Sequence, residues 1–177
     1  MQDVELFLSL AEIAGVFVGF GALIAVRSGG ASDVHEVVYM RAVVWMGMMT
    51  VVAALAPVTL GRYDLAAHQV WALSSVLILV AGGVMFASMA RTPEYKTAWT
   101  AELEADRVAR SRRLVVVGTA AYALYMLALV LAPIVIMLGV ASDLEGALYF
   151  TVVVLILLGA GWTLLARVLA QRRPATA

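Results

Sequence analysis

The stretch AEIAGVFVGFG, residues 11–21, decides how this chain folds. It lies inside a hydrophobic run over residues 4–26, which is long enough to cross the hydrocarbon core of a bilayer as a helix. Glu12 lies well inside this run, where a carboxylate is costly, and three glycines in seven residues allow another backbone to approach closely. We therefore expect a membrane-spanning helix that packs against a neighbour and carries the deepest charge in the protein.

Four further runs along the chain have the same character. Hydrophobic residues make up 64% of the 177 residues, whereas soluble domains contain about 45–50%. Backbone groups in lipid must find their hydrogen bonds within the segment, so each run is expected to be a helix. The sequence therefore predicts an all-α polytopic membrane protein with a single transmembrane domain over residues 1–177. Its five expected helices cover residues 4–26, 37–60, 65–90, 114–140 and 144–169.

The basic residues are distributed unevenly between the two ends of these helices. With five spans, eleven of the twelve lysines and arginines fall on one side of the membrane, and only Arg62 falls on the other. Because basic residues collect on the cytoplasmic side, we expect the N-terminus outside and the C-terminus in the cytoplasm. The outer side then collects acidic residues, among them Glu5, Asp64 and Asp143.

Two pairs of helices carry similar landmarks. Pro57 and Pro133 lie near the ends of the second and fourth runs, 76 residues apart, and Asp64 and Asp143 follow them 79 residues apart. We interpret these offsets as a duplicated helical hairpin, formed by helices two and three and by helices four and five, after an unpaired first helix. The alternative is chance similarity, since apolar segments match each other easily.

The one long connection, residues 91–113, is expected on the cytoplasmic side. Its aromatic residues recur at helical spacing on one face, which is typical of an amphipathic helix at a membrane surface. We expect Trp99 at headgroup level, and Arg110, Arg112 and Arg113 beside anionic lipid phosphates. The alternative is a solvated, charge-rich extension of the fourth helix.

The first helix carries two overlapping stripes at helical spacing. One stripe is polar, acidic, apolar, small, apolar and basic from the outer to the inner end, which suits an ion path with an acidic mouth and a hydrophobic constriction. These pore or ion candidates are Ser9, Glu12, Val16, Gly19, Leu23 and Arg27. The other stripe consists of small residues and suits close helix packing. Its members are Gly15, Gly19 and Ala22.

Two functions are compatible with these features. The first is an oligomeric membrane channel for cations, with the first helix lining the path and Glu12 near its outer mouth. The second is a non-catalytic structural or accessory membrane subunit that docks a partner helix through Gly15 and Gly19. Glu12 itself has two further interpretations, a structural hydrogen bond within the chain or a contact with a lipid or small ligand.

The composition argues against several other classes. The chain has no cysteine, and His35 and His68 are its only histidines and lie far apart, so no metal or haem site is expected. His68 is expected instead to anchor the chain at the membrane interface beside Trp71. Twelve acidic residues balance twelve basic ones, which gives no sign of a nucleic-acid partner. We expect no cofactor and no enzyme activity, and the expected partners are the lipid bilayer and further copies of the chain.

The N-terminal third resembles a known family. The elements that carry the resemblance are LAEIA at residues 10–14, FVGFGAL at residues 17–23, Arg41, and LAP at residues 55–57. They are similar to elements of a family of small uncharacterised prokaryotic integral membrane proteins. The resemblance implies a protein of the plasma (inner) membrane of a bacterium or archaeon, and it brings no activity with it.

Overall fold

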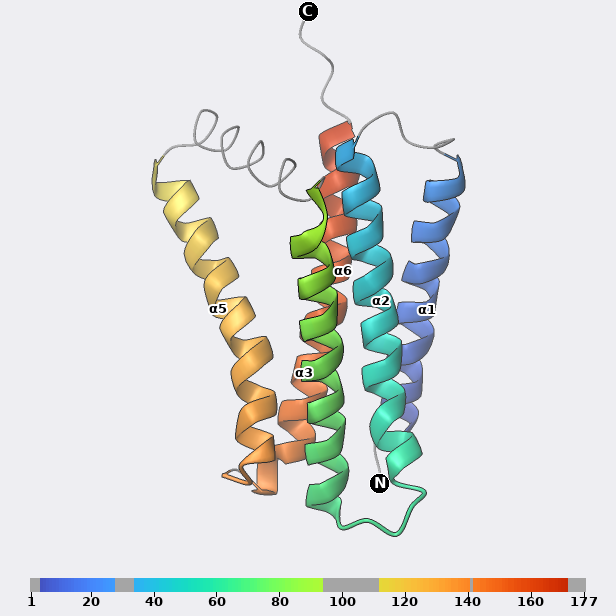
Figure 1. Cartoon of the computed structure of the whole chain (residues 1–177), viewed down its shortest axis with the longest axis vertical. Coiled ribbons are helices and arrows are strands. Elements are labelled where there is room, and N and C mark those ends of the chain that lie inside the picture. The colour runs from blue at the N-terminus through green and yellow to red at the C-terminus, as the bar shows by residue number, and fades with distance from the viewer. Residues whose placement is uncertain (1–3, 28–33, 94–111, 141, 172–177) are drawn as a thin grey trace, which may run out of the picture. The chain divides into compact units, whose positions relative to one another are not determined.

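The computed structural model describes residues 4–27, 34–93, 112–140 and 142–171. These residues form five α-helices, the short 3-10 helix η1 (Ser142–Leu144) and no strand (Figure 1). The helices are α1 (Val4–Arg27), α2 (Val34–Leu60), α3 (Ala67–Arg91), α5 (Arg112–Met137) and α6 (Glu145–Gln171).

Each of the five helices contains a segment that is long and apolar enough to cross a membrane. The apolar segments run from 20 to 25 residues, which matches the length that a helix needs to span the hydrocarbon core. The prediction of an all-helical chain with five such helices is therefore confirmed, and their composition indicates a membrane protein.

The fourth helix ends earlier than the sequence predicts. The expected helix covers residues 114–140, but α5 ends at Met137 because Gly139 adopts a left-handed conformation with φ of 64°. The Leu138 N–H donates to the Ile134 carbonyl and the Gly139 N–H donates to the Ile136 carbonyl, which satisfies the last turn of the helix. Hydrophobicity continues past the helix end, so the apolar pattern alone overestimates its length.

Both prolines at the ends of the second and fourth runs lie inside helices and are buried. Pro57 lies within α2, which continues to Leu60, and Pro133 lies within α5, which continues to Met137. The Pro57 carbonyl accepts a hydrogen bond from the Gly61 N–H at 2.9 Å. Each helix therefore runs about one further turn beyond its proline before it ends.

The chain divides into two compact units, which we describe separately. The first unit comprises Met1–Asp64 with Val153–Ala177, and the second comprises Leu65–Val152. The helix α6 contributes its first turns to the second unit and its remaining turns to the first. The expectation of a single transmembrane domain over residues 1–177 stays a prediction.

In the first unit, α1 and α2 pack closely through glycines. A Cβ atom at Gly47 of α2 would lie 2.6 Å from Val18 Cγ2 and 3.4 Å from the Ala14 carbonyl oxygen of α1. A Cβ atom at Gly21 of α1 would lie 3.1 Å from Val44 Cγ2 of α2. The two backbones can approach this far only because neither glycine has a side chain.

In the second unit, α3 and α5 meet near the C-terminal end of α5 and separate toward its N-terminal end (Figure 1). Pro133 and Ile136 in the last turns of α5 are buried, whereas Val116, Val117 and Leu124 in its first half are exposed. Exposed apolar side chains are compatible with lipid, since lipid tails are as apolar as leucine.

The close packing of α1 on α2 predicts that a larger side chain destabilises the protein at Gly47 of α2 but not at Gly83 of α3. We expect Gly47→Leu to lower the stability of the protein by about 1–3 kcal/mol, because the new side chain overfills the contact with Val18 and Ala14. The matched control is Gly83→Leu in α3, where a Cβ atom meets nothing within 4 Å. The midpoint of thermal unfolding in detergent is measured for both variants. Equal midpoints for Gly47→Leu and Gly83→Leu would contradict the close packing at Gly47.

Candidate functional site

The predicted pore stripe of α1 lies on an open face of the helix. Its members Ser9, Glu12 and Gly19 are exposed, and so are Val16 and Leu23, at 58% and 66% of their surface. Arg27 is the last residue of α1, and its side chain lies outside the described part of the structure. All five members with described side chains therefore face away from the packed interior of the chain.

The small-residue stripe of α1 is open as well. Gly15, Gly19 and Ala22 are exposed, and a Cβ atom at Gly15 or Gly19 would meet nothing within 4 Å. The contact of α1 with α2 instead uses the face that carries Ala14 and Gly21, both buried. No described residue of the chain makes the close approach expected at Gly15 and Gly19. Close packing of a helix from another molecule on this stripe stays a prediction.

The predicted headgroup contacts fall outside what the structure describes. Trp99 and Arg110 belong to residues 94–111, which lie outside the described ranges. Arg112 and Arg113 are the first residues of α5, but their side chains are not described. The amphipathic connection and its contacts with anionic lipid therefore stay predictions.

The second unit contains a polar pair that the sequence reasoning missed. His68 in the first turn of α3 places Nδ1 2.6 Å from Oε1 of Glu145, the first residue of α6. This distance is that of a short hydrogen bond between the imidazole nitrogen and the carboxyl oxygen. The Glu145 side chain is only 3% exposed while that of His68 is 47% exposed, so the imidazole covers a buried carboxylate from the solvent side.

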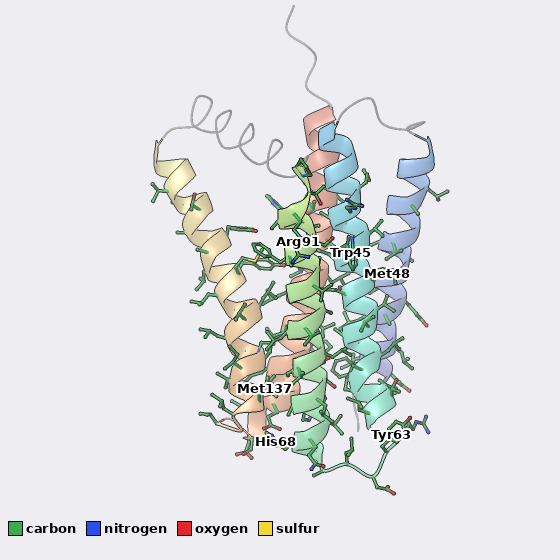
Figure 2. The ribbon with its side chains drawn as sticks, viewed as in Figure 1. Trp45, Met48, Tyr63, His68, Arg91 and Met137 are labelled. Carbon is green, nitrogen blue, oxygen red and sulfur yellow. The ribbon has the colours of Figure 1, made fainter. Side chains whose placement is uncertain are left out.

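The first turns of α3 and α6 place the two partners. Gln69 Oε1 accepts a hydrogen bond from the Ala66 N–H at 3.0 Å, which fixes the start of α3 next to His68. Glu145 lies at the N-terminal end of α6, where a carboxylate interacts favourably with the helix dipole. Figure 2 shows His68 at the end of α3 that lies near Met137, the last residue of α5.

Glycines and aromatic rings pack around the pair. A Cβ atom at Gly139 would lie 3.4 Å from Cε1 of His68, and one at Gly146 would lie 3.2 Å from Cζ2 of Trp71. The Trp71 and Tyr149 rings are 5.5 Å apart between centroids, with an interplanar angle of 46°. Trp71 therefore lies beside His68 on α3 as expected, but both residues contact the turn and the helix that follow α5.

One signal in the sequence could have located the pair. His68 and Glu145 are 77 residues apart, which lies between the offsets of 76 and 79 found for the paired prolines and aspartates. In a duplicated hairpin these residues occupy corresponding positions at the starts of two helices. A histidine and a glutamate at such positions can pair once the two helix starts are brought together.

The chemistry available to this pair is hydrogen bonding and charge pairing between two helices. Within the described residues, no group of three or more histidine, cysteine, aspartate or glutamate side chains could hold a metal ion. The pair therefore connects the starts of α3 and α6, and it also brings a titratable carboxylate into a largely apolar unit.

No family model, no curated protein and no solved structure matches this chain. The resemblance of the N-terminal third to prokaryotic membrane proteins therefore stays a prediction.

The geometry of the pair predicts a specific pattern of stabilities. We expect His68→Ala to destabilise the protein by about 1–3 kcal/mol, because it leaves the buried Glu145 carboxylate without its partner. Adding Glu145→Gln to that variant should restore part of the loss, since a neutral amide is less costly to bury than an unpaired carboxylate. Thermal unfolding of the single and double variants measures the interaction free energy between His68 and Glu145.

The matched control for Glu145 is Asp143→Asn, which removes an exposed acid two residues earlier in η1. This change should alter stability by less than about 0.5 kcal/mol. If the losses from His68→Ala and Glu145→Gln simply added, the two side chains would not interact in the way the distance indicates.

Proposed function

We propose that the protein is an oligomeric membrane channel for cations, with α1 lining the path. The observation that carries this proposal is the exposure of Glu12 in the middle of the apolar segment Val4–Leu23. A carboxylate that faces hydrocarbon is strongly unfavourable, so intramembrane acids face other protein or a water-filled path.

The other members of the α1 stripe support an ion path along the helix rather than one isolated contact at Glu12. Ser9, Val16, Gly19 and Leu23 are exposed on the same stripe as Glu12. In a ring of identical helices, the acids would form a negatively charged ring, and the valines and leucines would form hydrophobic constrictions below it. Acidic rings attract cations, and hydrophobic constrictions gate pores by excluding water.

The proposal includes a direction and a location. Eleven of the twelve basic residues support an N-terminus outside and a C-terminus in the cytoplasm, which puts Glu12 near the outer mouth. The resemblance of the first helix supports the plasma membrane of a prokaryote. A role without catalysis follows from the same proposal, since conduction needs no reacting group.

A duplicated hairpin remains part of the proposed architecture. Pro57 and Pro133 are both buried and both lie about one turn before the end of a helix, which supports equivalent roles in two repeats. The pairing of His68 with Glu145 across 77 residues supports the same equivalence.

The decisive experiment measures cation flux into liposomes that hold the purified full chain. Wild type should conduct, and Glu12→Gln should reduce flux or cation selectivity about tenfold, which corresponds to about 1.4 kcal/mol of lost stabilisation of the ion. Asp143→Asn, which removes an exposed acid outside α1, should leave the flux unchanged. The oligomer mass of each variant is measured on the same samples, so that loss of assembly is distinguished from loss of conduction.

Absence of flux from an intact wild-type oligomer would overturn the channel proposal. A second candidate would then stand, a non-catalytic accessory subunit that docks a partner helix through Gly15 and Gly19. The specific observation in its favour is that a Cβ atom at either glycine meets nothing within 4 Å, so a foreign helix can approach to backbone contact.

The docking candidate predicts the effect of filling this open face. Gly15→Leu should remove the complex on a native gel, because the side chain keeps a partner backbone at a distance, while the stability of the single chain stays unchanged. Gly83→Leu is the control, since it also adds a side chain in open space but on a different helix. An unchanged complex in Gly15→Leu would exclude docking through this stripe.

A further inference from the structure

Two serine hydroxyls in α3 lie in an unusual environment. Ser74 and Ser75 are completely buried, and neither hydroxyl oxygen has a hydrogen-bond partner among the described residues. A buried hydroxyl without a partner destabilises the folded protein, and two adjacent ones in an apolar helix call for an explanation.

Other hydroxyls of this chain avoid that cost within their own helix. Thr50, Thr151 and Thr163 each donate to the carbonyl oxygen four residues earlier, at 2.8–2.9 Å. The same carbonyls are available to serine in a helix. Ser74 and Ser75 make no such hydrogen bond to their own helix.

The two serines continue the polar cluster that starts at the His68–Glu145 pair. Ser75 lies seven residues after His68, which puts it on the same face of α3 and about 10 Å further along the helix. Ser74 lies beside the Tyr149 phenol, although the geometry falls short of a well-formed hydrogen bond. We call this cluster the α3–α6 seam. Its members are His68, Trp71, Ser74, Ser75, Glu145 and Tyr149.

We propose that the α3–α6 seam binds water molecules, held by the Ser74 and Ser75 hydroxyls and connected to the Glu145 carboxylate. Water has the size and the paired donors and acceptors that two unpartnered hydroxyls need, and buried waters typically satisfy such groups with about three hydrogen bonds. The partly exposed His68 lies at the solvent end of the seam, and the buried serines lie at its deep end.

Close packing beside the seam favours a ligand as small as water. Gly139 lies against His68 and Gly146 lies against Trp71 so closely that a methyl group at either position would touch the ring. The seam thus gives the buried Glu145 contact with exchangeable water, and this inference does not depend on the function proposed for α1.

X-ray radiolytic footprinting of the full chain in lipid nanodiscs tests the proposal. Brief exposure generates hydroxyl radicals from bound water, and these oxidise aromatic side chains next to it even when the side chains are buried. Tyr149, which is fully buried, should become labelled in the wild type. Phe7, which is 1% exposed and lies in the first unit, should stay unlabelled and serves as the internal control.

The variant Ser74→Ala/Ser75→Ala removes the proposed water ligands with little change of shape. The Tyr149 label should be lost in this variant, and its unfolding midpoint should fall, because hydrogen-bonded hydroxyls have been removed. Ser88→Ala, which changes an exposed serine of the same helix, should retain the label and the midpoint of the wild type.

Three results would overturn the proposal. The first is a wild-type Tyr149 that is labelled no more than Phe7. The second is a Tyr149 label that persists unchanged in the double alanine variant, which would assign the water to other groups. The third is a higher unfolding midpoint of the double variant, which is the result expected for hydroxyls buried dry.

Discussion

The structure depends on one constraint, the lack of hydrogen-bonding partners for polar groups in hydrocarbon. Most polar side chains of the described helices obey it locally. Thr50, Thr151 and Thr163 donate to their own helix, and His68 covers the buried carboxylate of Glu145. Two places among the described residues stand out against it, the exposed Glu12 on α1 and the unpartnered serines of α3. The proposed channel assembly would cover the first of them, and the proposed water would satisfy the second.

Glycine has two opposite uses in these helices. Gly21 and Gly47 let α1 and α2 approach until an added Cβ atom would be 2.6–3.1 Å from a valine side chain. Gly15 and Gly19, four residues apart on α1, have open surroundings instead. Since copies of a membrane protein can cover such an open face, the unfilled glycines are consistent with assembly beyond the single chain. One face of α1 thus packs on α2, and the face with Gly15 and Gly19 is open within the described chain.

The His68–Glu145 pair shows how a charged group can be built into an apolar helical unit. The carboxylate lies at a helix N-terminus, accepts a hydrogen bond from the imidazole and is shielded from solvent. Gly139 packs closely against the His68 ring, and Gly146 packs closely against Trp71, which contacts Tyr149. This arrangement connects two helix starts that are 77 residues apart, and it gives the proposed water in the seam a charged group to which it can connect.

The sequence by itself determined the all-helical architecture and the five apolar helices, because hydrocarbon demands long apolar segments whose backbone bonds are internal. It also identified Glu12 as the deep acid of α1. Only the tertiary structure decided which glycines are packed against another helix. A glycine is packed when its face of the helix meets a neighbour, and the spacing of glycines along the sequence does not show which face that is. The tertiary structure also decided the partner of His68, the end of α5 at the left-handed Gly139, and the isolation of Ser74 and Ser75. The His68 pairing joins residues 77 apart, and none of these features is encoded by local hydrophobicity.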